Sequence, residues 1–138
     1  MADTTGAQVA VVGAGPGGYA AAFLAADLGL KVTLIDPRPD PGGVCLYTGC
    51  IPTKALLHVA GFIQEAREAA AWGLRIPEPG IDLDTLRSWK DQVVKKLTGG
   101  LGQLTKKRNI TYLRGKARFT GKNSLQVTNE ENKTTDLE

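Results

Sequence analysis

Hydrophobic residues recur along the chain at two different spacings, and the changes between them divide its first part into strand, helix and strand. Residues 8–12 form a short apolar run that ends at a glycine, which is typical of a buried parallel strand. Residues 19–28 are rich in alanine and contain no glycine or proline, which predicts a helix that Gly29 terminates. Residues 31–36 predict a second strand, which the following prolines end. Residues 8–36 therefore predict a βαβ unit with a right-handed crossover.

The middle of the chain predicts an irregular loop followed by two long helices. Residues 37–49 contain several prolines and glycines and predict the loop. Residues 52–71 place apolar residues on one side of a helix, with a proline that the first turn tolerates. Residues 84–107 carry large apolar residues spaced by three or four, which predict the second helix. Its three glycines each weaken it by about 1 kcal/mol relative to alanine and predict a kink, at Gly99, Gly100 and Gly102.

The last part of the chain returns to strand patterns. Residues 110–114 predict a strand, and three shorter runs separated by turn residues predict an antiparallel meander, at 116–119, 124–127 and 133–137. The fold class that follows is α/β, a Rossmann-like domain with a parallel sheet plus an antiparallel β-meander. We expect this domain to be incomplete, because the chain does not return to a buried strand. Its expected parts are the βαβ unit at 8–36, a loop and helix at 42–71, a second helix at 84–107, and a strand and meander at 110–137.

The bulk composition narrows the class of protein without naming a function. With 138 residues, 42% hydrophobic and 22% charged, the chain has the size and composition of one globular domain. The net charge of +3 is too small to indicate nucleic-acid binding, and the basic run 106–108 is typical of a solvated helix end. No stretch reaches the roughly 20 apolar residues of a membrane span, and the start has neither a signal nor a transit pattern. We therefore expect a cytoplasmic protein.

Glycines between the first strand and the first helix form a dinucleotide-binding fingerprint. Residues 13–18 read Gly-Ala-Gly-Pro-Gly-Gly and match G-x-G-x-x-G. Gly13 would permit the tight turn, Gly15 would let a pyrophosphate approach the backbone, and Gly18 would let the helix pack closely on the strand. The helix start favours phosphate, and the carboxylate of Asp36, 18 residues after Gly18, can accept hydrogen bonds from ribose hydroxyls. The motif alone does not distinguish FAD from NAD.

Cys45 and Cys50 are the only cysteines, and they lie where the predicted loop enters a helix. At this spacing the two sulfurs can reach disulfide distance, although a reducing cytoplasm disfavours a purely structural bond. The helix start and Lys54 favour the reactive thiolate at Cys50. Two other interpretations are small cysteines that fit a core and half of a zinc site. A four-ligand zinc site is hard to build within the chain, because His58 is the only histidine, so no metal is expected. His58 is expected to be a partly exposed helix residue.

At these residues the sequence resembles the pyridine-nucleotide disulfide oxidoreductases, and within them the dihydrolipoamide dehydrogenases. Segment 12–19 is similar to the FAD fingerprint of this family, and segment 42–57 is similar to its redox-disulfide segment. The similarity covers nearly the whole chain, since it extends through 88–90, 97–100 and 119–121.

Three positions depart from the family pattern. Asp36 stands where glutamate is more usual, and although shorter it should still reach a ribose. Val44 and Tyr47 replace the usual threonine and asparagine beside the cysteines. The bulk of Tyr47 is expected to affect the geometry of that loop.

The resemblance implies a redox role for the two cysteines beside a flavin. Cys45 would be the interchange thiol for lipoyl-type disulfides, and Cys50 would be the charge-transfer thiol against the flavin. Lys54 would lie near the flavin ring, Asp36 would hold the adenosine ribose, and the backbone at 115–117 would touch the adenine end. The residues implied to contact FAD are Gly13, Gly15, Gly17, Gly18, Asp36, Pro37, Gly42, Gly43, Val44, Cys45, Lys54, Gly115 and Ala117.

The resemblance also implies a reaction, in which dihydrolipoamide and NAD⁺ give lipoamide and NADH through the disulfide and FAD. The usual assembly would be a homodimer that serves the lipoyl domains of 2-oxo-acid dehydrogenase complexes or glycine cleavage. The NAD, central and interface domains of the family are absent from the 138 residues, so we expect an N-terminal fragment that does not turn over. Two alternatives stay open: a non-catalytic nucleotide- or partner-binding module, and a small flavin-free dithiol redox protein.

Overall fold

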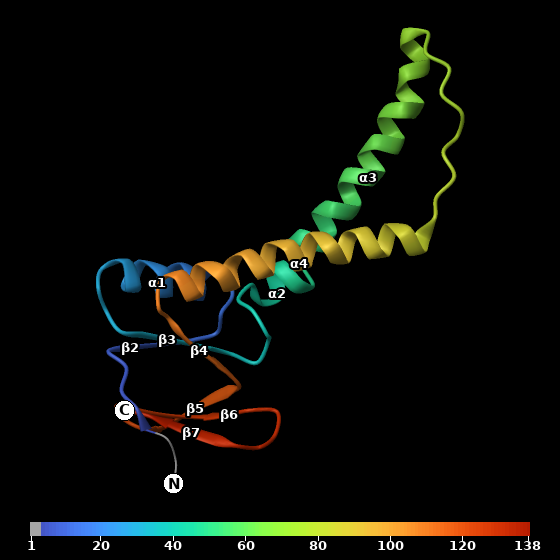
Figure 1. Ribbon diagram of the computed structural model, residues 1–138. Helices are drawn as coiled ribbons and strands as arrows, with labels where there is room; N and C mark the ends of the chain where they lie inside the picture. The colour runs from blue at the N-terminus through green and yellow to red at the C-terminus, as the bar shows by residue number, and fades with distance from the viewer. Residues whose placement is uncertain (1–3) are drawn as a thin grey trace.

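The computed structural model describes residues 4–138, and they are arranged in three layers (Figure 1). The middle layer is a parallel sheet of β2 (Val9–Val12), β3 (Val32–Asp36) and β4 (Thr111–Arg114), in the order β2-β3-β4. Helices lie on one face of this sheet, and an antiparallel sheet lies on the other. The carboxyl ends of the parallel strands therefore meet at one edge, where the fingerprint glycines and Asp36 lie.

Strand β3 is buried along its whole length because its two faces serve different cores. Val32 and Leu34 belong to the cluster beneath the helices, and Ile35 belongs to the cluster shared with the antiparallel sheet. This alternation follows from the two-residue period of a strand. It explains why this segment lacks the polar alternation of a half-exposed strand.

Helix α1 (Pro16–Asp27) links β2 to β3 and confirms the predicted βαβ unit. It begins three residues before the predicted start, with Pro16 in its first turn, where proline loses no helical hydrogen bond. It ends where Gly29 adopts a φ of +86° and its N–H donates to the carbonyl oxygen of Ala26.

The prediction of a loop across residues 37–49 is wrong in its second half, because residues Gly43–Tyr47 form a short helix, α2. Five residues are too few to show a helical period, so the pattern of the sequence could not reveal it. Helix α3 (Cys50–Glu68) follows after two residues and ends in a 3-10 turn, η1 (Ala69–Trp72). It starts at Cys50 rather than at residue 52, so both cysteines are helical.

Helix α4 (Leu83–Lys107) runs without interruption through its three glycines, where a kink was predicted. Its start is capped by the Asp82 carboxylate, which accepts hydrogen bonds from the N–H groups of Asp84 and Thr85. One of the glycines has a packing role, since a Cβ at Gly102 would overlap the Asp40 carboxylate. Helices α3 and α4 form a long hairpin that projects from the layered body (Figure 1).

The predicted meander is confirmed by β5 (Lys116–Gly121), β6 (Ser124–Thr128) and β7 (Thr134–Leu137). Each of these strands pairs antiparallel with the next one along the chain. A further strand that the sequence did not predict, β1 (Thr4–Thr5), pairs parallel with β7. The α/β class with a parallel and an antiparallel sheet is therefore confirmed.

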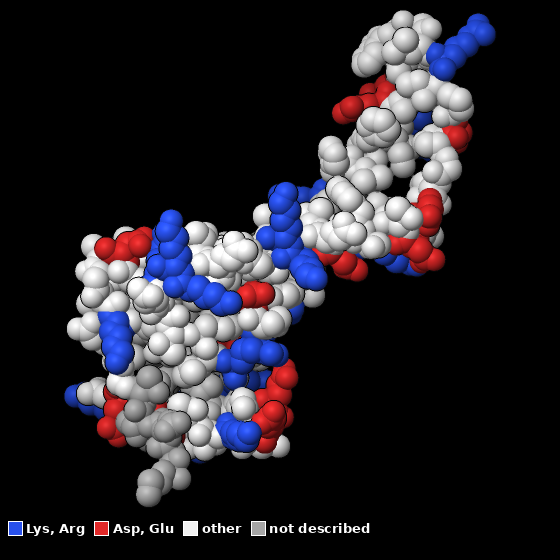
Figure 2. All heavy atoms as spheres, in the orientation of Figure 1, with Lys and Arg blue, Asp and Glu red and all other residues white. Residues whose placement is uncertain are grey.

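The surface carries charges of both signs. On the face shown in Figure 2, basic and acidic side chains are interspersed over the body and the hairpin. Within residues 4–138, no helix combines the length and the hydrophobicity that crossing a membrane requires.

Candidate functional site

The glycine turn between β2 and α1 is closed by hydrogen bonds and packing from both sides. Gly13 has a φ of +94°, and its N–H donates to the carbonyl oxygen of Ile35 at 2.8 Å. A Cβ at Gly18 would overlap the carbonyl oxygen of Gly13, so the helix approaches the strand as closely as the sequence predicts. By contrast, a Cβ at Gly13 or Gly17 would meet no atom of the described residues within 4 Å.

The open side of this turn suits an anion. Among the described residues, no side chain caps the start of α1 at Gly15, so the first N–H groups of the helix are available. They carry the positive end of the helix dipole toward the space that the glycines leave clear. The arrangement therefore fits the pyrophosphate of a dinucleotide.

Asp36 holds the turn and the next loop together. It is only 8% exposed, and its two oxygens accept hydrogen bonds from the N–H groups of Ala14 at 2.8 Å and Arg38 at 2.9 Å. Each carboxylate oxygen retains a second acceptor position. The ribose contact stays a prediction, but the structural use of Asp36 was missed by sequence reasoning.

The fingerprint and the cysteine segment pack against each other, backbone to backbone. The N–H of Gly42 donates to the carbonyl oxygen of Ala14 at 2.7 Å. A Cβ at Gly43 would lie 2.6 Å from the Cα of Gly15, so only glycine fits there. Gly42 and Gly43 also have φ values of +151° and +58°, which favour glycine. These contacts place α2 directly beside the nucleotide turn.

The two cysteines lie next to each other across the junction of α2 and α3. Cys45 is half-buried in α2 and Cys50 is exposed at the start of α3, and both are free thiols. A side-chain hydrogen bond with Cys50 is the main cause that raises the pKa of the Cys45 thiol, and burial and the charge of Cys50 add to it. The backbone of Cys50 and the cation of Lys54 oppose this rise. That the two sulfurs reach disulfide distance stays a prediction.

Other predicted residues occupy the two ends of this site. Lys54 and His58 are exposed on α3, in the turns that follow Cys50. At the other end, the N–H of Gly115 donates to the carbonyl oxygen of Asp36 at 3.1 Å. This bond holds the start of the meander at the carboxyl end of β3, next to Asp36. Ala117 lies further along, against the core that the two sheets share. Pro37 and Val44 are exposed, next to Asp36 and Cys45 respectively.

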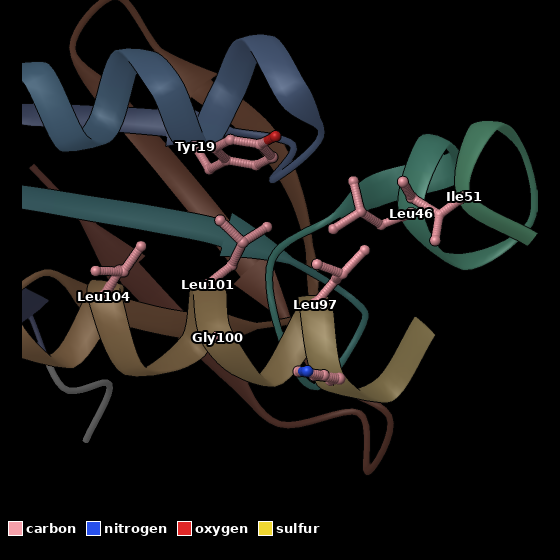
Figure 3. Close-up of a pocket in the computed structure, with 8 residues that line it drawn as sticks. Tyr19, Leu46, Ile51, Leu97, Gly100, Leu101 and Leu104 are labelled. Carbon is pink, nitrogen blue, oxygen red and sulfur yellow. The ribbon is translucent and has the colours of Figure 1, made fainter. Parts of the chain in front are cut away.

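An apolar pocket of about 580 Å³ lies between α1, the α2–α3 junction and α4 (Figure 3). Leu46 and Ile51, which follow the two cysteines in sequence, enter it from one side. Leu101 and Leu104 of α4 project into it from the side opposite Tyr19 of α1. Its lining residues are Tyr19, Leu46, Ile51, Lys96, Leu97, Gly100, Leu101 and Leu104.

Comparisons with known proteins agree with this geometry. The profile of the family described as pyridine nucleotide-disulphide oxidoreductase matches residues 7–137. The chain is 48% identical to a dihydrolipoyl dehydrogenase of Vibrio cholerae over 97% of its own length and 28% of the relative's. It is 52% identical to one of Haemophilus influenzae over 86% of its length and 25% of the relative's. A mitochondrial dihydrolipoyl dehydrogenase of Arabidopsis thaliana is 43% identical over 87% of the chain's length and 24% of the relative's.

The chain thus spans about a quarter of the length of these relatives. The profile match extends over nearly all of the chain and includes both the glycine turn and the cysteine pair. The chain belongs to the pyridine nucleotide-disulphide oxidoreductase family.

Proposed function

We propose that this chain supplies the FAD-binding and disulfide-bearing part of an oxidoreductase that converts dihydrolipoamide and NAD⁺ to lipoamide and NADH. The observation that supports this proposal is the packing of Gly43 on Gly15, which brings the segment with Cys45 and Cys50 against the glycine turn. The names of the relatives support the choice of substrate.

The residues present fit a dinucleotide. The open space beside Gly13 and Gly17 and the uncapped start of α1 would hold the pyrophosphate, and Asp36 would hold the ribose. The backbone at 115–117 would face the adenine, and Cys50 and Lys54 would lie toward the reactive end. When bound, the flavin would supply two-electron exchange between the dithiol and NAD⁺.

The chemistry of the chain's own residues is thiol–disulfide exchange. A thiolate of dihydrolipoamide attacks the Cys45 sulfur of the oxidised pair and displaces Cys50 as a thiolate. The second substrate thiol then attacks the mixed disulfide, which closes the lipoamide ring and releases Cys45. Dihydrolipoamide loses two electrons and two protons as it becomes lipoamide, and the protein pair gains them. The raised pKa of Cys45 favours its return to the protonated thiol.

The wider activity is also a proposal. The full reaction would belong to a homodimer that serves lipoyl domains in the cytoplasm. Because the chain covers about a quarter of each relative, we propose that it performs thiol exchange but does not by itself reduce NAD⁺.

The test is an anaerobic exchange assay on the oxidised chain. Dihydrolipoamide and NAD⁺ are added with and without FAD, protein thiols are counted by site-resolved alkylation, and NADH is followed by absorbance. We expect one dihydrolipoamide to reduce the disulfide of each chain to two thiols that can be alkylated, FAD to bind, and no NADH to form. Cys45→Ser and Cys50→Ser are the matched controls.

Each alternative predicts a different result. Exchange without FAD binding at saturating cofactor would support the flavin-free dithiol protein. FAD binding without any exchange would support a nucleotide-binding module, and either result would overturn the proposal.

A further inference from the structure

Helix α2 carries Cys45 but has little stability of its own. It has five residues, Gly43–Tyr47, and among the described residues no side chain caps its start at Gly42. An isolated helix of this length is unstable in water because the cost of nucleation is not recovered. Contacts outside the helix must therefore fix where Cys45 lies.

Tyr47, the last residue of α2, makes such contacts. Its hydroxyl donates a hydrogen bond to the carbonyl oxygen of Asp40 at 3.1 Å and accepts one from the N–H of Asp40 at 3.3 Å. The guanidinium of Arg38 lies over its ring, 4.5 Å from the ring centroid. One side chain thus joins the end of α2 to the loop that follows β3.

That loop is itself held in place at both ends. The N–H of Arg38 donates to Asp36, and the hydroxyl of Tyr112 donates to the carbonyl oxygen of Arg38 at 3.0 Å. Burial and the nearby Asp36 carboxylate raise the pKa of Tyr112, so this hydroxyl stays a donor. Asp40 packs against Gly102 of α4. These contacts hold the loop in one position, and Tyr47 attaches α2 to it.

We propose that Tyr47 is a positioning residue, whose hydroxyl attaches α2 to the loop at Asp40 and thereby sets the distance between Cys45 and Cys50. The proposal deepens the proposed function, since it concerns the same dithiol, but it applies to the sulfur pair whether or not a flavin is bound. The attachment raises the effective concentration of each thiol toward the other and so favours the disulfide.

The test is the equilibrium of the purified chain with a glutathione redox buffer. The two thiols lose two electrons and two protons to form the disulfide, and one glutathione disulfide is reduced to two glutathiones. The fraction oxidised is measured by alkylation and mass spectrometry in the wild type, Tyr47→Phe and Tyr112→Phe. Tyr112→Phe is the matched control, because it removes a similar hydrogen bond to the same loop that has no partner in α2.

We expect Tyr47→Phe to lower the equilibrium constant for disulfide formation by about three- to tenfold, the range for lost hydroxyl hydrogen bonds. Tyr112→Phe should stay within about twofold of the wild type. A second variant, Arg38→Met, keeps the hydroxyl bonds but removes the cation from the ring, and should lower the constant by about two- to fivefold. If circular dichroism shows that Tyr47→Phe is unfolded, the equilibrium constant of Arg38→Met alone tests the proposal.

Several results would overturn the proposal. An unchanged constant in folded Tyr47→Phe would show that its hydroxyl does not position the pair. A raised constant would show that Tyr47 holds the sulfurs apart, and an equal fall in Tyr112→Phe would assign the effect to the loop in general. Because no flavin or lipoamide enters this assay, failure here leaves the test of the proposed function unaffected.

Discussion

Gly43 packs on Gly15 so closely that the two backbones leave no room for a side chain between them. A Cβ at Gly43 would lie 2.6 Å from the Cα of Gly15, and the φ of Gly43 is +58°. Two segments that are separate motifs in the sequence are thereby one structural unit. The spacing between nucleotide turn and dithiol is set by main chain, which has little freedom to relax.

Gly43→Ala should therefore destabilise the protein. The left-handed backbone costs an alanine about 1–2 kcal/mol, and the overlap with Gly15 adds to it, so we expect a loss of at least about 2 kcal/mol in the free energy of unfolding. Urea unfolding followed by circular dichroism measures it. Gly99→Ala in α4 is the control, because its Cβ would meet no described atom within 4 Å, and it should stabilise by up to about 1 kcal/mol. Equal effects at the two positions would contradict the prediction.

Gly18 and Gly17 are neighbours with opposite surroundings. A Cβ at Gly18 would overlap the carbonyl oxygen of Gly13, whereas one at Gly17 would meet no described atom within 4 Å. We expect Gly18→Ala to lower the free energy of unfolding by about 3 kcal/mol and Gly17→Ala to change it by less than about 0.5 kcal/mol. Thermal and urea unfolding of the pair check this. A stable Gly18→Ala variant would mean that α1 can move away from β2.

Replacing Asp36 should destabilise the turn even without a nucleotide. Asp36→Ala would leave the N–H groups of Ala14 and Arg38 without their acceptor, at a cost of about 3 kcal/mol for two hydrogen bonds to a charged group. Asp36→Asn keeps one acceptor oxygen and should fall between the wild type and Asp36→Ala. The measurement is unfolding of the cofactor-free protein. If Asp36→Ala is as stable as the wild type, the carboxylate has no structural role.

The pH dependence of the alkylation rate of Cys45 should show the effect of Cys50 on its pKa. The thiolate is the reactive form, and the raised pKa of Cys45 means that less of it is present at neutral pH than for an ordinary cysteine. Its alkylation rate should therefore rise at a higher pH than that of a free thiol.

Two variants separate the causes of this shift. Cys50→Ala removes the main cause and should move the alkylation profile of Cys45 to lower pH. Lys54→Met removes an opposing charge and should move it to higher pH. Site-resolved mass spectrometry gives the rates. A profile that is the same in all three proteins would show that the sulfurs do not interact in solution.

The elements with a long, regular pattern could be predicted from the sequence. The two long helices show a helical apolar period, and the βαβ unit and the meander show short apolar runs bounded by glycine, proline and other turn residues. Gly13 and Gly18 were also predictable, because a known backbone turn requires glycine at these positions.

The contacts between motifs could not be predicted. Helix α2 is shorter than two turns, and β1 has two residues, so neither shows a period. The sequence predicts that the glycines of α4 weaken the helix. In the structure, the missing side chain of Gly102 leaves the space that the Asp40 carboxylate occupies. Tyr47 stood out only as a departure from the family pattern. Its role depends on a loop that the sequence alone does not place beside it.

The two sulfurs lie on either side of a joint of two residues, Thr48 and Gly49, between one helix that is tied down and one that projects. The 19 residues of α3 extend for about 28 Å, so a rotation of roughly 5° at the joint would displace the far end by roughly 2.5 Å. Such a rotation would therefore move the far end of α3 more than it moves the sulfur at the start of the helix.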